Sequence, residues 1–154
     1  MRVLIQRVKN AKCIIDNKIY SSIEDGLLLF VGFKDTDDEK ILSYFVKKIT
    51  KMRIFSDNFG KMNLSIQDIR GKILSISQFT LYADPYNGNR PSFTKALAYD
   101  KANVLYLKFN KLLNEVVETK EGVFGADMKI GLTNDGPVTI ILDSQDIKED
   151  IYGK

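Results

Sequence analysis

The sequence contains no histidine and no tryptophan, and it has a single cysteine among its 154 residues. Without histidine, the chain lacks the commonest general base, the usual proton relay of serine and cysteine hydrolases, and the commonest zinc ligand. Cys13 alone forms no internal disulfide and no thiolate cluster, and we expect it to be a small core residue. Any catalysis must therefore depend on other groups, and we expect neither a metal nor a cofactor.

Long apolar runs and a strong net charge are also missing. The longest apolar run, Leu27–Val31, is far shorter than the roughly 18 residues that a membrane span needs, and residues 1–7 alternate like a strand rather than a signal peptide. The net charge of +3 and the pI near 8.8 permit contact with a polyanion without diagnosing one. We expect a cytoplasmic protein without membrane contact, folded as one domain over residues 1–154.

Seven segments have patterns typical of β-strands, and two segments have apolar residues at helical spacing. The strand-like segments are residues 2–9, 11–16, 19–23, 27–33, 72–81, 129–133 and 138–143. One predicted helix follows a capping box at Thr36–Glu39, and the other is capped near Asp100. Their apolar stripes are Ile41, Phe45, Ile49 and Met52, and then Ala102, Leu105, Phe109, Leu112 and Val116. We expect the polar tail, residues 145–154, to be loosely held.

The stretch Ser77–Leu81 ends an apolar run with hydroxyl and amide side chains. A glutamine side chain such as Gln78, or free backbone N–H groups at a strand end, can hold a developing oxyanion. The Thr80 hydroxyl can act as a nucleophile only with a base, and none is visible nearby. The simpler interpretation is that these polar side chains are satisfied at a sheet edge, and the residues alone leave both interpretations open.

The stretch Asn134–Thr139 places a Gly-Pro pair, Gly136 and Pro137, between two strand-like runs. Because Asn, Asp, Gly and Pro all favour turns, a turn between strands is the simpler interpretation. The bond before proline also adopts the cis form more readily than other peptide bonds. Neighbouring main-chain oxygens that face the same way would then bind a substrate ammonium group.

These two stretches resemble the signature motifs of the D-aminoacyl-tRNA deacylases. Five further segments are similar to the same family and occur in the family order along nearly the whole chain. They are Ile5–Val8, Arg53–Asp57, Gly60–Asn63, Arg90–Phe93 and Phe124–Met128. The resemblance implies an α+β fold: a compact, β-rich single domain with antiparallel, barrel-like sheets and two main helices, assembled as a homodimer.

The resemblance also implies how the site is built. Gly136 and Pro137 of one subunit would enter the active site of the other as a Gly-cisPro segment, supported by Arg7 and Asn134. Its main-chain carbonyls would bind the substrate's α-amino group and leave no room for an L side chain. The side chain of a D-amino acid would project outward.

For the ester, the resemblance implies that Ser77, Gln78, Phe79 and Thr80 hold the carbonyl and its oxyanion through main-chain donors and Gln78. The terminal adenosine of the tRNA would meet Phe124, Gly125 and Met128, with stacking as the physical basis. The ribose 2′-OH would take part directly, which agrees with a chain that lacks histidine.

We therefore predict an enzyme that hydrolyses the ester of D-aminoacyl-tRNA, and of achiral glycyl-tRNA, as chiral proofreading in translation. The expected partners are the 3′ end of aminoacylated tRNA and a second copy of the chain, and neither DNA nor a membrane. The residues leave three alternatives open: a non-catalytic module that binds RNA ends, an esterase with Thr80 as nucleophile, and a dimeric scaffold in which Gly136 and Pro137 form a trans surface turn.

Overall fold

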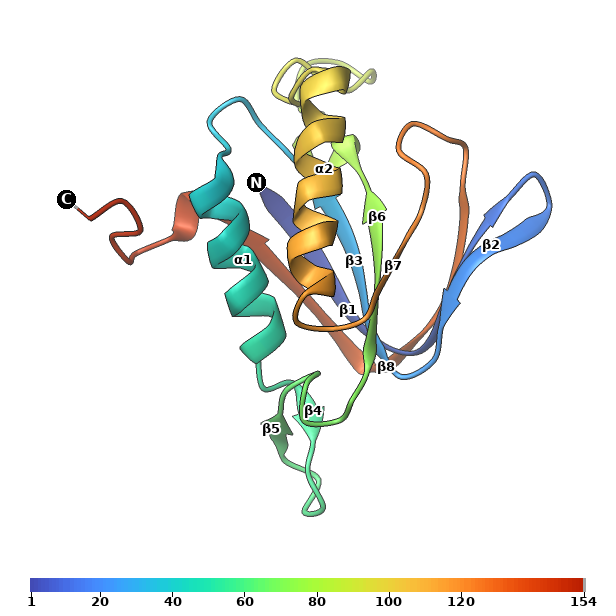
Figure 1. The fold of residues 1–154 in the computed structure, drawn as a ribbon. Helices are drawn as coiled ribbons and strands as arrows, with labels where there is room; N and C mark the ends of the chain where they lie inside the picture. Colours follow the sequence, from blue (N-terminus) through green and yellow to red (C-terminus); the bar gives the residue numbers. More distant parts are fainter. Residues whose placement is uncertain (154) are drawn as a thin grey trace.

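The computed structural model describes residues 1–153, which form a mixed β-sheet with two α-helices (Figure 1). The strands are β1 (Arg2–Ile15), β2 (Lys18–Ile23), β3 (Gly26–Gly32), β4 (Phe55–Ser56), β5 (Met62–Leu64), β6 (Lys72–Ser77), β7 (Thr119–Glu121) and β8 (Lys129–Asp143). The helices are α1 (Glu39–Lys51) and α2 (Tyr99–Asn114), with short 3₁₀ helices η1 (Phe79–Tyr82) and η2 (Ser144–Asp146). Within residues 1–153, neither helix is long and apolar enough to cross a membrane.

Strand β1 is the centre of the sheet because it is paired on both of its edges. Its first half pairs with β3, its second half with β2, and β8 runs antiparallel along most of its length. Strands β6 and β7 extend the sheet from β3 in parallel. The Ser21 hydroxyl donates to the Glu121 carbonyl at 2.9 Å, which links β2 to β7 and curls the sheet toward closure.

The predicted α+β, barrel-like fold with two helices is confirmed, but the sheet is mixed rather than antiparallel. A parallel pair cannot be joined by a tight hairpin and needs a crossover. The connection from β3 to β6 contains α1, and the connection from β6 to β7 contains α2. The small β4–β5 hairpin lies outside this sheet and projects from one end of the molecule (Figure 1).

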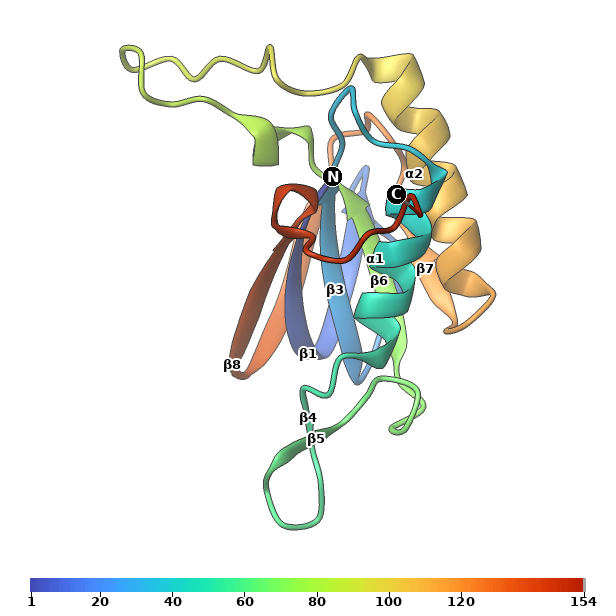
Figure 2. The ribbon, with the colours of Figure 1, turned by 90° about the vertical axis from the view of Figure 1, so that its left-hand side faces the viewer.

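The two helices cover the same face of the sheet (Figure 2). Successive residues of a strand point to opposite faces, so Val3 and Ile5 of β1 meet the helices. They form one apolar cluster with Phe45 of α1 and Phe109 of α2. A smaller cluster includes Cys13, which is buried as predicted.

Both helices begin at other residues than the capping signals predict. Helix α1 begins after Asp38, whose carboxylate accepts from the Ile41 N–H at 3.0 Å. The predicted capping box, with Thr36 as the N-cap, is therefore wrong. Helix α2 begins after Ala98 without a side-chain cap, and Asp100 lies in its first turn. Adjacent residues offer equivalent caps in the sequence, and tertiary contacts decide between them: Asp37 instead accepts from the Lys34 N–H and pairs with the terminal amine of Met1.

The buried side of α2 is rotated relative to the predicted stripe. Ala102 and Phe109 are buried as predicted, but Tyr106 and Leu113 replace Leu105 and Leu112 in the deepest positions, and Val116 is exposed. Tyr106 reaches the sheet and donates from its hydroxyl to the Ser75 carbonyl at 2.7 Å. Burial raises the pKa of Tyr106 to about 12, so this hydroxyl stays protonated and remains a donor.

Strand boundaries also differ from the prediction. The segments 2–9 and 11–16 are one strand, β1, and the segments 129–133 and 138–143 both belong to β8, because the two strands pair with each other along both halves. Register shifts near Val8 absorb the irregular stretch 134–137. The predicted strand 72–81 ends at Ser77, where the chain turns into η1.

The C-terminal tail is held more firmly than its polar composition suggests. Ile147 and Ile151 pack against the main apolar cluster, and the Tyr152 hydroxyl bonds to the Asp38 carboxylate at 3.0 Å. These contacts hold the tail beside the start of α1 as far as Tyr152 (Figure 2), and Lys154 lies outside the described residues.

A substitution at Gly26 tests how closely β3 and β6 pack at the start of β3. A Cβ atom built on Gly26 would overlap the carbonyl of Lys72 in the paired strand β6. We expect Gly26→Ala to lower the free energy of unfolding by about 2 to 3 kcal/mol, because backbone on both strands must move. Urea denaturation measures the change, with Gly60→Ala as the control: Gly60 has a positive φ but faces open space, so its cost is about 1 kcal/mol. Equal losses for the two variants would contradict this packing.

Candidate active site

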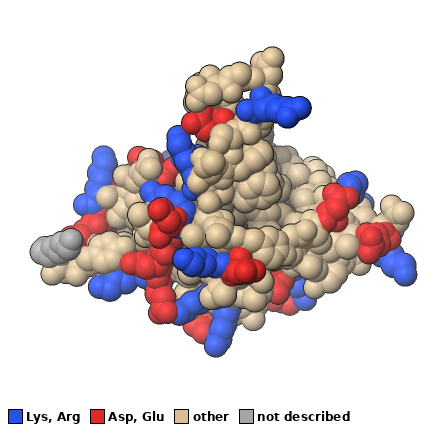
Figure 3. Space-filling model, turned by 90° about the horizontal axis from the view of Figure 1, so that it is seen from above, with Lys and Arg blue, Asp and Glu red and all other residues tan. Residues whose placement is uncertain are grey.

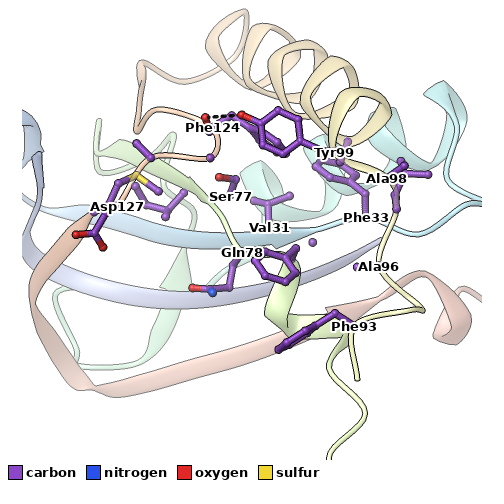
Figure 4. Close-up of a pocket in the computed structure, with 18 of the residues that line it drawn as sticks. Val31, Phe33, Ser77, Gln78, Phe93, Ala96, Ala98, Tyr99, Phe124 and Asp127 are labelled. Atoms are coloured by element: carbon purple, nitrogen blue, oxygen red, sulfur yellow. Dashed lines mark hydrogen bonds between the residues drawn. The ribbon is translucent and has the colours of Figure 1, made fainter. Parts of the chain in front are cut away.

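A cavity of about 670 Å³ opens at the end of the sheet where β3 and β6 finish (Figure 4). The turn after β6 contributes Ser77, Gln78 and Phe79, and the loop before β8 contributes Phe124, Gly125 and Met128. Two of the groups that the sequence predicts as site residues, far apart along the chain, thus line one cavity.

The turn after β6 leaves main-chain donors without internal acceptors. The Gln78 N–H donates to the Val31 carbonyl at 2.8 Å, and the 3₁₀ turn then begins with a bond from the Leu81 N–H to the Gln78 carbonyl. Among the hydrogen bonds of residues 1–153, none uses the main-chain N–H of Phe79 or Thr80. Gly32 makes room for this turn, because a Cβ there would lie 3.0 Å from the Gln78 carbonyl oxygen.

The side chains of this turn are arranged around Gln78. Its amide nitrogen donates to the hydroxyl oxygen of Thr80, which is exposed and does not line the cavity. In the part of the chain that the structure describes, the Thr80 hydroxyl has no bond to a carboxylate or an amine. Phe79 packs edge-to-face against Phe93, with ring centroids 5.1 Å apart. No group among the described residues is therefore in place to deprotonate Thr80.

The opposite wall of the cavity is aromatic. The Phe124 ring packs against Tyr99 at 4.9 Å and against Tyr106 at 5.7 Å between centroids. Gly125 has a φ of +78°, which favours glycine, and Met128 lines the same wall. This wall suits a flat, weakly polar group such as a nucleobase.

Charged groups contribute little to the cavity. Asp127 is the one carboxylate among the described residues that lines it, and this side chain is exposed and paired with Lys129 at 2.8 Å. Acidic and basic side chains are interspersed around the face seen in Figure 3, so the net charge forms no extended basic area there. Within residues 1–153, no group of three His, Cys, Asp or Glu side chains is placed to hold a metal ion.

Gly136 and Pro137 lie at the other end of the same sheet. In the sheet register, Ser77 of β6 pairs with Val31 of β3. Asn134 of β8 pairs with Val8 of β1, and Val8 pairs with Gly26 of β3. About five strand residues separate the two levels, or about 17 Å at roughly 3.3 Å per residue. A single chain therefore does not bring the two signature stretches together.

Arg7 and Asn134 fix the backbone around Gly136 and Pro137. Buried Arg7 donates from Nε to the Asp135 carbonyl at 2.9 Å and from Nη1 to the Ile54 carbonyl at 2.7 Å. The Asn134 side chain accepts from the Val138 N–H at 2.8 Å. Gly136 has a φ of +135°, and its peptide bond to Pro137 is cis. A Cβ at this glycine would lie 2.9 Å from Arg7 Nη2, so the residue is tightly enclosed on that side.

Several cavity residues have no signal in the sequence. Gly32 and Phe33 come from the end of a strand that has the pattern of ordinary core, and Tyr99 comes from the start of α2. Phe93 lies in one of the family-like segments, which is the one local hint that the loop before α2 belongs to the site. An exposed tyrosine at a helix start looks like any surface residue until the fold places it over a cavity.

Comparison with known proteins defines the class. The family model described as D-Tyr-tRNA(Tyr) deacylase matches residues 4–143. The chain therefore belongs to the D-Tyr-tRNA(Tyr) deacylase family, and it is an enzyme that hydrolyses the ester between an amino acid and tRNA. Aminoacyl-tRNA is accordingly its substrate.

Two solved structures are similar to this chain. One, described as c-Myc DNA Unwinding Element Binding Protein, is 36% identical with a TM-score of 0.89, and the match covers 94% of this chain and 99% of that one. The other, described as a probable eukaryotic D-amino acid tRNA deacylase, is 17% identical with a TM-score of 0.80, and the match covers 92% and 97% of the two chains. The second likeness supports the fold.

Substitutions of Thr80 test whether the reaction needs a side-chain nucleophile. We expect Thr80→Ala to keep kcat for deacylation within about tenfold of the wild type, because the exposed hydroxyl has no base beside it among the described residues. Single-turnover deacylation kinetics measure this, with Thr80→Ser as the matched control that keeps the hydroxyl. If the alanine variant folds but is inactive while the serine variant is active, Thr80 is the nucleophile.

Proposed function

We propose that the protein hydrolyses D-aminoacyl-tRNA, and glycyl-tRNA, at a site that is completed by a second subunit. The observation that carries this proposal is a cavity that joins unpaired main-chain donors to an aromatic wall, without a general base among the described residues, in a chain of this family. The enzyme then acts mainly through backbone atoms and through the substrate itself.

The ester carbonyl binds beside Ser77 and Gln78. When water attacks, the carbonyl oxygen gains negative charge, and the unpaired N–H groups of Phe79, at the cavity wall, and of Thr80, next along the turn, are the donors available to it. Donors held in place before the reaction stabilise this charge without reorganisation, and such stabilisation often contributes more to catalysis than any other effect. The Gln78 amide, held by Thr80, lies beside the same position.

The terminal adenosine binds against Phe124, Gly125 and Met128. Its base stacks on the aromatic wall, and its ribose then lies between this wall and the Gln78 turn. The ribose 2′-OH is next to the ester and can take part in proton transfer. This placement accounts for a cavity whose single carboxylate among the described residues, Asp127, is exposed and ion-paired.

Support for the homodimer comes from an apolar row on the sheet face opposite the helices. Leu4 of β1 is level with Phe30 of β3 and Ile141 of β8, so the three side chains share a face. Ile141 is 62% exposed, and Leu4 and Phe30 are half-buried. Apolar groups of this kind are typical of a surface that a partner covers.

A two-fold axis that is parallel to this face and perpendicular to the strands aligns the two signature stretches. Such an axis reverses the strand direction, so the Gly136 end of one sheet meets the Gln78 end of the other. The Gly136–Pro137 carbonyls of the partner then bind the α-amino group of the substrate and occupy the space of an L side chain. Glycine lacks that side chain and escapes the exclusion.

Two other functions have less support. A non-catalytic module that binds RNA ends uses the same aromatic wall but leaves the unpaired donors beside Gln78 without a role. The DNA binding in the name of one similar structure belongs to that protein, and the interspersed charges in Figure 3 do not favour it here.

We propose one domain, residues 1–154, that acts where aminoacyl-tRNA is used, in the cytoplasm.

Chirality is tested with matched substrates. We expect the wild type to release tyrosine from D-tyrosyl-tRNA at least roughly a hundredfold faster than from L-tyrosyl-tRNA, which corresponds to about 2.7 kcal/mol of discrimination. Glycyl-tRNA should also be hydrolysed. Acid-precipitable counts of labelled aminoacyl-tRNA follow the reaction, and an RNA-end-binding module would bind these substrates without turnover. Equal rates on the D and L substrates would refute exclusion of the L side chain.

The shared site is tested by mixing two impaired variants, assayed with substrate well below KM, where weaker binding of the base also lowers the rate. One carries Phe124→Ala in the cavity, and the other carries Gly136→Ala, where a side chain meets Arg7. In a mixed dimer both defects fall in one site and the other site is intact, so random reassortment should recover about a quarter of wild-type activity. Size-exclusion chromatography and circular dichroism check that each variant is folded. Complete absence of recovery in confirmed mixed dimers means that each site lies within one chain.

A further inference from the structure

Tyr99 lines the mouth of the cavity beside Phe124, and the proposed function gives it no role. It is the first residue of α2, and Figure 4 shows its ring beside Phe124 above the cavity. The ring centroids are 4.9 Å apart with an interplanar angle of 74°, and the Tyr99 hydroxyl donates to the Phe124 carbonyl at 3.4 Å. Tyr99 nevertheless stays 60% exposed. An aromatic ring that is held in place but left open to solvent is available to a ligand.

Gly125 and Tyr99 depend on each other. A Cβ atom built on Gly125 would lie 2.7 Å from Tyr99 Cε2 and closer still to the hydroxyl. Real Cβ atoms do not approach other atoms this closely, so any side chain at residue 125 displaces the Tyr99 ring. The positive φ of Gly125 also favours glycine, but this preference does not involve Tyr99. The missing side chain at residue 125 is therefore what allows Tyr99 to lie against Phe124.

We propose that Tyr99 is a binding and positioning residue that forms the second aromatic wall for the terminal nucleobase of the tRNA. This inference rests on the proposed function, because it assigns a residue to the same substrate. The nearly perpendicular rings of Tyr99 and Phe124 form a corner, in which a base stacked on one ring meets the edge of the other. The bond from the Tyr99 hydroxyl to the Phe124 carbonyl holds the loop in this shape.

The geometry separates this role from catalysis of the ester. Tyr99 lies on the base side of the cavity, and its hydroxyl bonds to Phe124 rather than to the turn at Gln78. Losing its ring should weaken the binding of substrate and transition state equally, which raises KM and leaves kcat unchanged. A residue that merely stabilises the fold would lower the melting temperature and not affect KM selectively.

The first experiment measures KM and kcat of the full-length enzyme for D-tyrosyl-tRNA. We expect Tyr99→Ala to raise KM about tenfold with kcat within about twofold, which is the range for loss of one stacked base. Tyr99→Phe keeps the ring and should raise KM at most about threefold. Tyr20→Ala is the matched control, because Tyr20 is 55% exposed and lies on β2 away from the cavity, and it should leave both constants unchanged.

The second experiment is a double-mutant cycle with Gly125→Ala. The φ preference at residue 125 is the same in both backgrounds and cancels, so the cycle isolates the displacement of Tyr99. We expect Gly125→Ala to raise KM much more in the Tyr99 background than in the Tyr99→Ala background. Additive effects would show that the two residues act separately and would overturn the inference.

The outcomes distinguish this inference from the proposed function. If the wild type does not hydrolyse D-tyrosyl-tRNA, the proposed function fails. If the wild type is active but Tyr99→Ala and Tyr20→Ala have the same KM as the wild type, the role of Tyr99 is refuted while the function stands. A fall in kcat at constant KM likewise contradicts a wall for the base. Adenosine monophosphate as a competitive inhibitor provides a separate readout, because its inhibition constant should rise in Tyr99→Ala.

Discussion

The pairing of β1 along both of its edges is the constraint on which the rest of the structure depends. Strands β3 and β8 lie on either side of its first half, and their pairing with β1 fixes the register of the other strands in the sheet. It places the turn after β6 at one end and the Gly136 segment at the other. Because paired strands are nearly rigid along their length, no local movement closes this distance, and under the proposed function a complete site needs a second copy of the chain.

Catalysis in the proposed site uses mainly backbone N–H and C=O groups, which every polypeptide has. The donors beside Gln78 have no partner within residues 1–153, because the chain leaves the sheet there and turns tightly into η1. The Gly136 segment is shaped by Arg7, which holds two carbonyls from separate parts of the chain. Side chains in such a site mainly hold backbone atoms in place, which explains how a chain without histidine belongs to a family of hydrolases.

The secondary structure was predictable where local pattern and tertiary contacts agree. The buried strand near Leu27–Val31 and the stripe Ile41, Phe45 and Ile49 are found as expected. The N-terminus of α1 was not predictable, because Thr36, Asp37 and Asp38 are all good N-caps. Asp38 is the cap because Asp37 contacts Lys34 and the distant Met1, and the local capping pattern contains neither residue. The end of β6 was missed for a related reason, since Phe79 and Leu81 continue an apolar run although the backbone has already turned.

The residues by themselves determined the chemistry that is available: no histidine base, no thiolate cluster, polar groups at Ser77–Thr80 and a Gly-Pro pair at Gly136. The family resemblance of these stretches was readable because motifs are local in sequence. Only the tertiary structure decided that Gln78 and Phe124 line one cavity, that Gly136 lies at the far end of the sheet, and that Tyr99 stands beside Phe124. The physical reason is that strand register and helix placement bring together residues far apart in the chain, and no local pattern encodes that proximity.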